Sequence, residues 1–195
     1  MQKGAITSAV VIGVIGIGLW VWTHPVSNLS SDAGIDISSA FANTAPVQGS
    51  DAVSAPEATF THNYIDKSYG FSFSYPDGYS VRSTPNADGA GNTVLVQNDS
   101  TKKGVQILIT PYTDTDTNIT EKKITTDIPD MKISNAQNVN VGPAGHGLAF
   151  ISDNGAFDGN SREVWFVYRG NLYQISTYAS YDEFIKTLLS TWKFN

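Results

Sequence analysis

The hydrophobic and polar positions divide the chain into three parts. Ala5 to Trp22 is an unbroken run of 18 residues without a charge. His24 to Thr59 is rich in Ser, Ala, Asp and Pro and has neither a helical nor an alternating period. From Phe60 onward, short apolar segments are separated by turn residues. This pattern predicts a transmembrane anchor at 5–22, a disordered spacer at 23–59 and a folded domain at 60–195.

The apolar run has the length and the flanking residues of a membrane anchor. At 1.5 Å per residue it makes a helix of about 27 Å, close to the roughly 30 Å of the hydrocarbon core. Trp22 stands at its far end, where indole rings favour the headgroup region, and Pro25 would end the helix. Lys3 precedes the run, and the next Lys or Arg is Lys67. The positive-inside rule then predicts a cytoplasmic N-terminus at 1–4 and an extracytoplasmic domain, in the periplasm or on the cell surface.

Two other interpretations of this segment stay open. A cleaved signal peptide has a shorter apolar region, closely followed by a small-x-small site. Here the nearest such site, Ala40-Phe41-Ala42, begins 18 residues past Trp22. Lys3-Gly4 before the run resembles a prepilin processing site, but the run lacks the acidic residue expected early in a pilin helix. We favour the uncleaved anchor, with the lipid bilayer as the partner of Ala5 to Trp22.

Within the domain, several segments have strand patterns, such as the alternation of aromatic residues with Ser from Phe71 to Tyr75. Asp66 to Gly70 and Pro76-Asp77-Gly78 supply turn chemistry around that segment. Asn118-x-x-Glu121 has the pattern of a helix cap and predicts a helix at 119–126. The predicted strands are Asn63–Ile65, Phe71–Tyr75, Thr93–Gln97, Val105–Thr110, Lys132–Val141 and Gly147–Ser152.

The clearest hairpin lies near the end of the chain. Strands at 162–169 and 172–178 flank Gly170-Asn171, a two-residue turn signal. With that turn, Phe166 faces Ile175 and Tyr168 faces Tyr173. One face of the hairpin is then apolar and is the predicted core, made of Val164, Phe166, Tyr168, Tyr173 and Ile175.

A final amphipathic helix completes the predicted domain. Ser180-x-x-Glu183 has the pattern of a capping box, and apolar residues follow at helical spacing as far as Trp192. Its apolar stripe must pack on a sheet. Strands, a helix, more strands and a helix indicate an α+β fold, an antiparallel sheet with helices packed on it.

Two motifs give this domain a family resemblance. Tyr69-Gly70-Phe71-Ser72-Phe73-Ser74-Tyr75-Pro76-Asp77-Gly78-Tyr79 resembles the opening of PsbP-like domains, although Tyr79 stands where a Trp is usual. The segment from Phe184 to Phe194 is similar to the end of that family, so the resemblance covers 60–195. It implies an α/β/α sandwich around an antiparallel sheet. Members range from photosystem extrinsic subunits to adaptor and exported domains, and the family offers no catalytic site to carry over.

Composition excludes several kinds of partner and site. The net charge is −6 and Lys and Arg are not clustered, which argues against a nucleic-acid partner. The chain has no Cys, which excludes disulfides, thiolate metal sites and a lipoprotein anchor. Asp114-x-Asp116-x-Asn118 begins like a calcium loop but lacks the Gly and Glu that an EF-hand requires. We therefore predict no catalytic, metal-binding or cofactor-binding residues.

The remaining candidate site is a possible binding face on the last hairpin. Trp165 and Tyr178, with Arg169 and Glu163 nearby, could contact a ligand, and His146 is the only histidine well inside the domain. Aromatic residues in such positions more often lie under a packed helix, so both interpretations are kept.

These observations favour a membrane-tethered, extracytoplasmic binding or assembly module with a protein partner, and no catalysis. One alternative is a surface or pilus-like subunit that assembles through its N-terminal helix. Another is an extracytoplasmic hydrolase.

Overall fold

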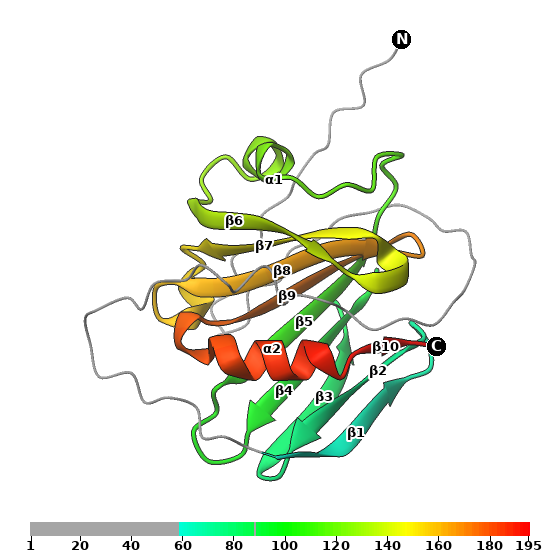
Figure 1. Ribbon diagram of the computed structural model, residues 1–195, viewed down its shortest axis with the longest axis vertical. Coiled ribbons are helices and arrows are strands. Elements are labelled where there is room, and N and C mark those ends of the chain that lie inside the picture. The colour runs from blue at the N-terminus through cyan, green and yellow to red at the C-terminus, as the bar shows by residue number, and fades with distance from the viewer. Residues whose placement is uncertain (1–58, 88) are drawn as a thin grey trace.

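A computed structural model describes residues 59–87 and 89–195 (Figure 1). The predicted anchor at 5–22 and nearly all of the predicted spacer lie outside these residues. In the described part of the chain, neither α-helix has the length and hydropathy of a membrane span. The strands are β1 (Phe60–Asp66), β2 (Phe71–Pro76), β3 (Tyr79–Pro85), β4 (Asn92–Asn98), β5 (Gly104–Pro111), β6 (Ile133–Asn140), β7 (His146–Ser152), β8 (Ser161–Tyr168), β9 (Asn171–Tyr178) and β10 (Lys193–Phe194), and the helices are α1 (Glu121–Asp127) and α2 (Asp182–Ser190).

The strands form two antiparallel sheets. The large sheet has the order β3-β4-β5-β9-β8-β7-β6, and the small sheet has the order β1-β2-β10. Figure 1 shows α2 beside the small sheet on one face of the large sheet, while α1 lies near β6. The fold is therefore mostly antiparallel β with a helix on either side, which is the predicted α+β class in its coarse form.

The prediction missed two strands. β3 follows the predicted turn Pro76-Asp77-Gly78 and pairs with β4 along its whole length. Its side chains are mostly exposed, so it lacks the apolar alternation that marks a half-buried strand. β10 has only two residues and pairs with the start of β2. A segment that short carries no period of its own.

The register of the last hairpin differs from the prediction. Phe166 faces Tyr173 and Val164 faces Ile175, so the two-residue turn is Arg169-Gly170. Both turn residues have positive φ, 46° and 68°, as a type I′ turn requires. The predicted Gly170-Asn171 turn was wrong, because Arg169 has a left-handed φ and forms the turn with Gly170, while Asn171 begins β9. The predicted core face was correct: all five of its residues lie in one buried cluster.

Both helices begin differently from their predicted caps. The hydroxyl of Thr120, not Asn118, accepts the backbone N–H of Lys123 at 3.2 Å and caps α1. The capping box predicted at Ser180 does not form, because a 3-10 turn at Ala179–Tyr181 leads directly into α2. Asp182 and Glu183 lie in the first turn of α2 instead, where negative charge is favourable.

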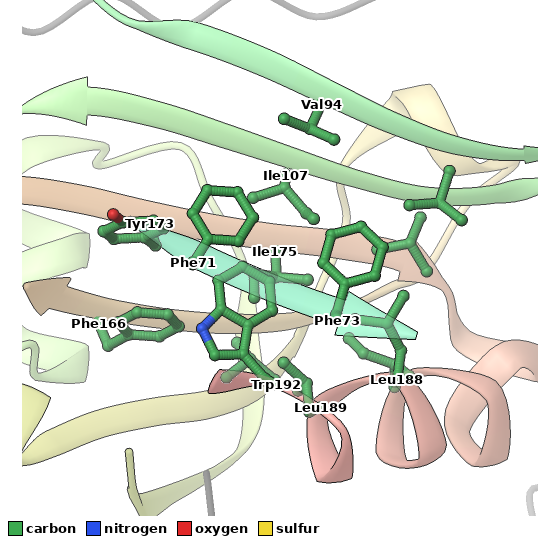
Figure 2. Packing of buried hydrophobic residues seen from close by; sticks show 14 of the residues in the cluster. Phe71, Phe73, Val94, Ile107, Phe166, Tyr173, Ile175, Leu188, Leu189 and Trp192 are labelled. Carbon is green, nitrogen blue, oxygen red and sulfur yellow. The ribbon is translucent and has the colours of Figure 1, made fainter. Parts of the chain in front are cut away.

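The main core lies between the large sheet, the small sheet and α2. Figure 2 shows Trp192 beside Phe71 and Phe73 of β2, with Leu188 and Leu189 of α2 next to it. The Trp192 and Phe71 rings stack at 4.4 Å with an interplanar angle of 4°. These aromatic contacts join the end of the domain to its beginning.

A second, smaller core lies on the opposite face of the large sheet under α1. Ile124 and Ile128 of this helix region pack with Trp165, Val167 and Leu172 of β8 and β9. Every residue of β8 is consequently buried, since both faces of this central strand are covered.

Candidate functional site

The five residues of the predicted binding face do not form one surface. Glu163 and Trp165 are close on β8, and the indole Nε1–H of Trp165 donates to Glu163 Oε2 at 3.1 Å. Tyr178 ends β9 on the same side of the sheet and packs edge-on against Phe157 at 5.4 Å. Arg169, in the hairpin turn, and His146, at the exposed start of β7, lie at the other end of these strands.

Trp165 fits the interpretation of an aromatic residue under a packed helix. It is 5% exposed, and it belongs to the core beneath α1. Its ring meets Phe150 of β7 edge-on at 5.3 Å. Packing therefore accounts for most of its contacts, while its N–H serves the neighbouring carboxylate.

Glu163 is a fully enclosed carboxylate, 1% exposed, surrounded by hydrogen-bond donors. Oε1 accepts from Ser161 Oγ at 2.5 Å and from Ser152 Oγ at 3.2 Å. Oε2 accepts from Trp165 Nε1–H and from Ser176 Oγ. None of the ion pairs among the described residues includes Glu163. Among the described residues, its negative charge is thus stabilised by hydrogen bonds from neutral donors and not by a positive charge.

Burial and hydrogen bonds act in opposite directions on the pKa of the Glu163 carboxyl. Burial raises the pKa of the Glu163 carboxyl above its ordinary value, because removal from water disfavours the charged form. The donors of Ser161, Ser176, Trp165 and Ser152 act in the opposite direction and do not cancel that effect. Titratable groups shifted by burial often mark functional sites, which makes this cluster a candidate.

We predict a pH-dependent stability that comes from Glu163. A raised folded-state pKa means that the folded chain binds the proton more tightly than the unfolded chain. Stability from this group is then greatest below the ordinary Glu pKa of about 4.3 and falls as the pH rises towards the folded-state pKa. Glu163→Gln cannot ionise, so its stability should lack this decline.

The measurement is urea denaturation of the full chain in detergent micelles from about pH 4 to about pH 8, compared with Glu163→Gln. Glu183→Gln, an exposed glutamate on α2, is the matched control and should follow the wild type. Parallel pH profiles for wild type and Glu163→Gln would contradict the prediction.

The second candidate is a groove of about 640 Å³ at the turn between β1 and β2. Its lining comes from that turn, from the β8–β9 turn and from the end of the described chain. Ile65 borders it and is 59% exposed, the most exposed large hydrophobic side chain among the described residues. Lys67 and Arg169 contribute positive charge to the same lining.

Hydrogen bonds hold the walls of this groove in place. Asp66 Oδ1 accepts the backbone N–H groups of Ser68 and Tyr69 at 3.0 Å each, and Oδ2 accepts the Tyr64 hydroxyl at 3.0 Å. Arg169 Nη1 donates to the carbonyl oxygen of Asn195 at 3.1 Å. With two cationic side chains, Lys67 and Arg169, against the one carboxylate of Asp66, the side chains of the lining carry a net positive charge.

Sequence reasoning placed a turn at Asp66 to Gly70, which is confirmed, but it did not identify the groove. The available signal was Ile65, an isoleucine directly before a turn and next to Asp66-Lys67. Within residues 59–87 and 89–195, no three His, Asp or Glu side chains gather as metal ligands do.

The comparisons with known proteins concern the fold alone. No protein-family model matches this chain, and no curated protein matches it in sequence. The chain is similar in fold to cyanobacterial PsbP (CyanoP) from Synechocystis sp. PCC 6803, seen in its solution structure. The TM-score is 0.46 and the identity is 14%, over 76% of this chain and 99% of that chain. At this distance the likeness supports no statement about ligands or activity.

Proposed function

We propose that this chain is a membrane-tethered, extracytoplasmic binding module that engages a protein partner through the groove at the β1–β2 turn, without catalysis. The observation that carries the proposal is the groove itself, with Ile65 exposed at its border and Lys67 and Arg169 in its lining. Single exposed apolar side chains are common on protein surfaces, so the support comes from the combination of Ile65 with the concave, positively charged lining.

The chemistry of the groove favours an acidic partner segment. Ile65 offers an apolar contact, and the two cationic side chains attract carboxylates. Asp66, the acidic residue of the lining, is buried and bonded within its own turn. We therefore propose that the partner presents Asp or Glu next to an apolar side chain, in an extended segment.

The position of the groove also suits a tethered module. Phe60 pairs with Pro76 at one end of the small sheet, and Asp66 pairs with Phe71 at the other. β1 therefore carries the chain about 20 Å, at roughly 3.3 Å per residue, from the side of the spacer to the groove. If residues 5–22 span the bilayer, the groove lies at the end of β1 remote from the tether.

A peptide-binding experiment tests the partner chemistry. The probe is a short fluorescent peptide that alternates Asp with Leu, and its control alternates Lys with Leu. We expect the full chain in nanodiscs to bind the acidic peptide in preference to the basic one. Lys67→Glu should weaken the binding about tenfold, because an attraction becomes a repulsion.

Lys122→Glu on α1 is the matched control, since Lys122 is also an exposed lysine but lies outside the groove lining. It should leave the affinity within about twofold, which is the scale of screened long-range charge effects. Equal binding of both peptides, or equal weakening by both charge reversals, would refute the groove as the site.

Topology can be tested separately because the chain has no Cys. A single cysteine at Lys67→Cys should react with a membrane-impermeant maleimide on intact cells, or on spheroplasts if an outer membrane intervenes. Gln2→Cys should react only after the membrane is permeabilised. The opposite pattern would place the domain in the cytoplasm, and labelling of the Gln2→Cys chain as a short released peptide would show cleavage.

A further inference from the structure

The void beside Glu163 is the feature that packing does not account for. It has about 20 Å³, enough for one particle of the size of a water molecule. Glu163, Ser176, Gln174 and Gln106 line it from the sheet, and Asn154 and Phe157 line it from the segment that precedes β8. It lies on the α1 side of the large sheet, well away from the groove proposed above.

The lining contains one buried acceptor that no donor of the described residues serves. The carboxylate of Glu163 already accepts from Ser161, Ser176 and Trp165. The single proton of Ser152 Oγ is shared between Glu163 Oε1 at 3.2 Å and Ser161 Oγ at 2.8 Å. Ser176 is the serine that lines the void, and its hydroxyl donates to Glu163 and keeps its own lone pairs for another partner. Gln174 is 3% exposed, and its Oε1 has no hydrogen-bond partner within the described part of the chain. An unpartnered buried carbonyl oxygen costs free energy unless something at this position binds it.

The charge of the site also calls for a binding partner that the described residues do not supply. One carboxylate is buried among neutral groups, and no ion pair of the described residues neutralises it. A buried charge normally requires an opposite charge or a metal ion. A single carboxylate balances one positive charge, whereas calcium sites usually combine several carboxylates.

We propose that the void between Glu163, Ser176 and Gln174 binds one monovalent cation, either an alkali-metal ion or ammonium. The bound ion accepts lone pairs from Gln174 Oε1 and from the Ser176 hydroxyl, and its charge offsets that of Glu163. Ammonium would be recognised by donation of N–H groups to the same oxygens, and sodium by direct coordination. In either case the cation fills a polar position within the fold.

The test measures the melting temperature of the full chain in detergent micelles while sodium chloride replaces choline chloride at constant ionic strength. Choline is too large for the void. Sodium should raise the melting temperature saturably, by about 2–5 °C at tenfold excess over the dissociation constant. Parallel arms contain potassium, ammonium and calcium. A larger shift with ammonium than with the alkali metals would identify recognition through N–H donors.

Variants separate a specific site from a general salt effect. Gln174→Leu keeps the volume and removes the unpartnered oxygen, so the sodium-dependent shift should disappear. Glu183→Gln removes an exposed charge and should keep the shift in full. If Gln174→Leu unfolds, the line width of the sodium NMR signal gives a second readout on the wild type. The wild type should broaden that signal, and ammonium or potassium should narrow it again by competition.

Equal melting temperatures in sodium, ammonium, potassium and choline would mean that the void holds only a water molecule, and this would overturn the proposal. Stabilisation by calcium alone would overturn it too, because it would indicate a divalent site. Failure here leaves the groove untouched, since the acidic-peptide experiment does not involve Glu163.

Discussion

Replacing Trp192 by alanine should lower the free energy of unfolding by about 3–5 kcal/mol, the range observed when a buried aromatic residue is truncated. Trp192 is fully buried between the small sheet, the large sheet and α2. Its ring stacks on Phe71 at 4.4 Å and on Phe73 at 5.6 Å, and it meets Tyr173 edge-on at 6.3 Å. Truncation would leave a cavity where these three elements meet.

Urea denaturation of the full chain, followed by far-UV circular dichroism, measures this loss. Trp192→Phe separates packing from polarity, because the indole Nε1 has no hydrogen-bond partner among the described residues. Phenylalanine keeps most of the stack and removes that buried N–H, so its cost should be only about 1–2 kcal/mol. Lys193→Ala, at the exposed neighbouring position, should change stability by less than about 0.5 kcal/mol. A similar loss for Trp192→Ala and Lys193→Ala would contradict the central role of this ring.

The second large effect is expected at the ion pair between β8 and α2. Arg162 is 1% exposed, and its Nε and Nη2 donate to Asp182 Oδ1 and Oδ2 at 2.6 and 3.0 Å. Asp182→Ala would leave the buried guanidinium without this bidentate partner. We expect a loss of about 3 kcal/mol, at the lower end for a broken buried pair because Asp182 is partly exposed.

The two partners together give a sharper experiment. In the double variant Arg162→Met with Asp182→Leu, both charges are replaced by apolar groups of similar size. Its stability should lie close to that of the wild type, because the desolvation cost disappears with the attraction. Glu183→Ala, one residue further along the same helical turn, is the matched control and should cost less than about 1 kcal/mol. A double variant as unstable as Asp182→Ala would show that the pair contributes net stability.

The sequence was most informative where one face of a strand is buried. The apolar face of the last hairpin was predicted in full, because alternation decides which side of a strand faces the core. The pairing register was not, because it depends on which two residues form the turn. The positive φ of Arg169 moved the pairing by two residues.

That register decided whether the Glu163 site could be predicted. With Gly170-Asn171 as the turn, Glu163 would face Tyr178, and the two would appear as part of an aromatic binding face. In the structure Glu163 faces Ser176, and Ser152 and Ser161 approach from the paired end of β7 and β8. The hydroxyl groups around the carboxylate come from three strands, so no local sequence pattern contains them.

The groove could not be predicted from the sequence, for a different reason. Its lining joins Ile65 and Lys67 from the start of the domain to Arg169 and Asn195 from its end. Only the packing of the small sheet brings these segments together. The turn at Asp66 was predictable from its local chemistry, but the surface that it helps to form was not.

The pairing of β2 with β10 has a consequence for the order of events during synthesis. The backbone N–H of Ser74 donates to Thr191 Oγ1 across 117 positions of the chain, and Phe71 pairs with Phe194. Contacts between such distant segments form slowly, since a long loop must close first. The residues of β1 and β2 are therefore synthesised before the residues that cover them have been added to the nascent chain. If export starts at the N-terminal segment, the domain crosses the membrane before it can fold. It then folds on the extracytoplasmic side, where it is expected to work.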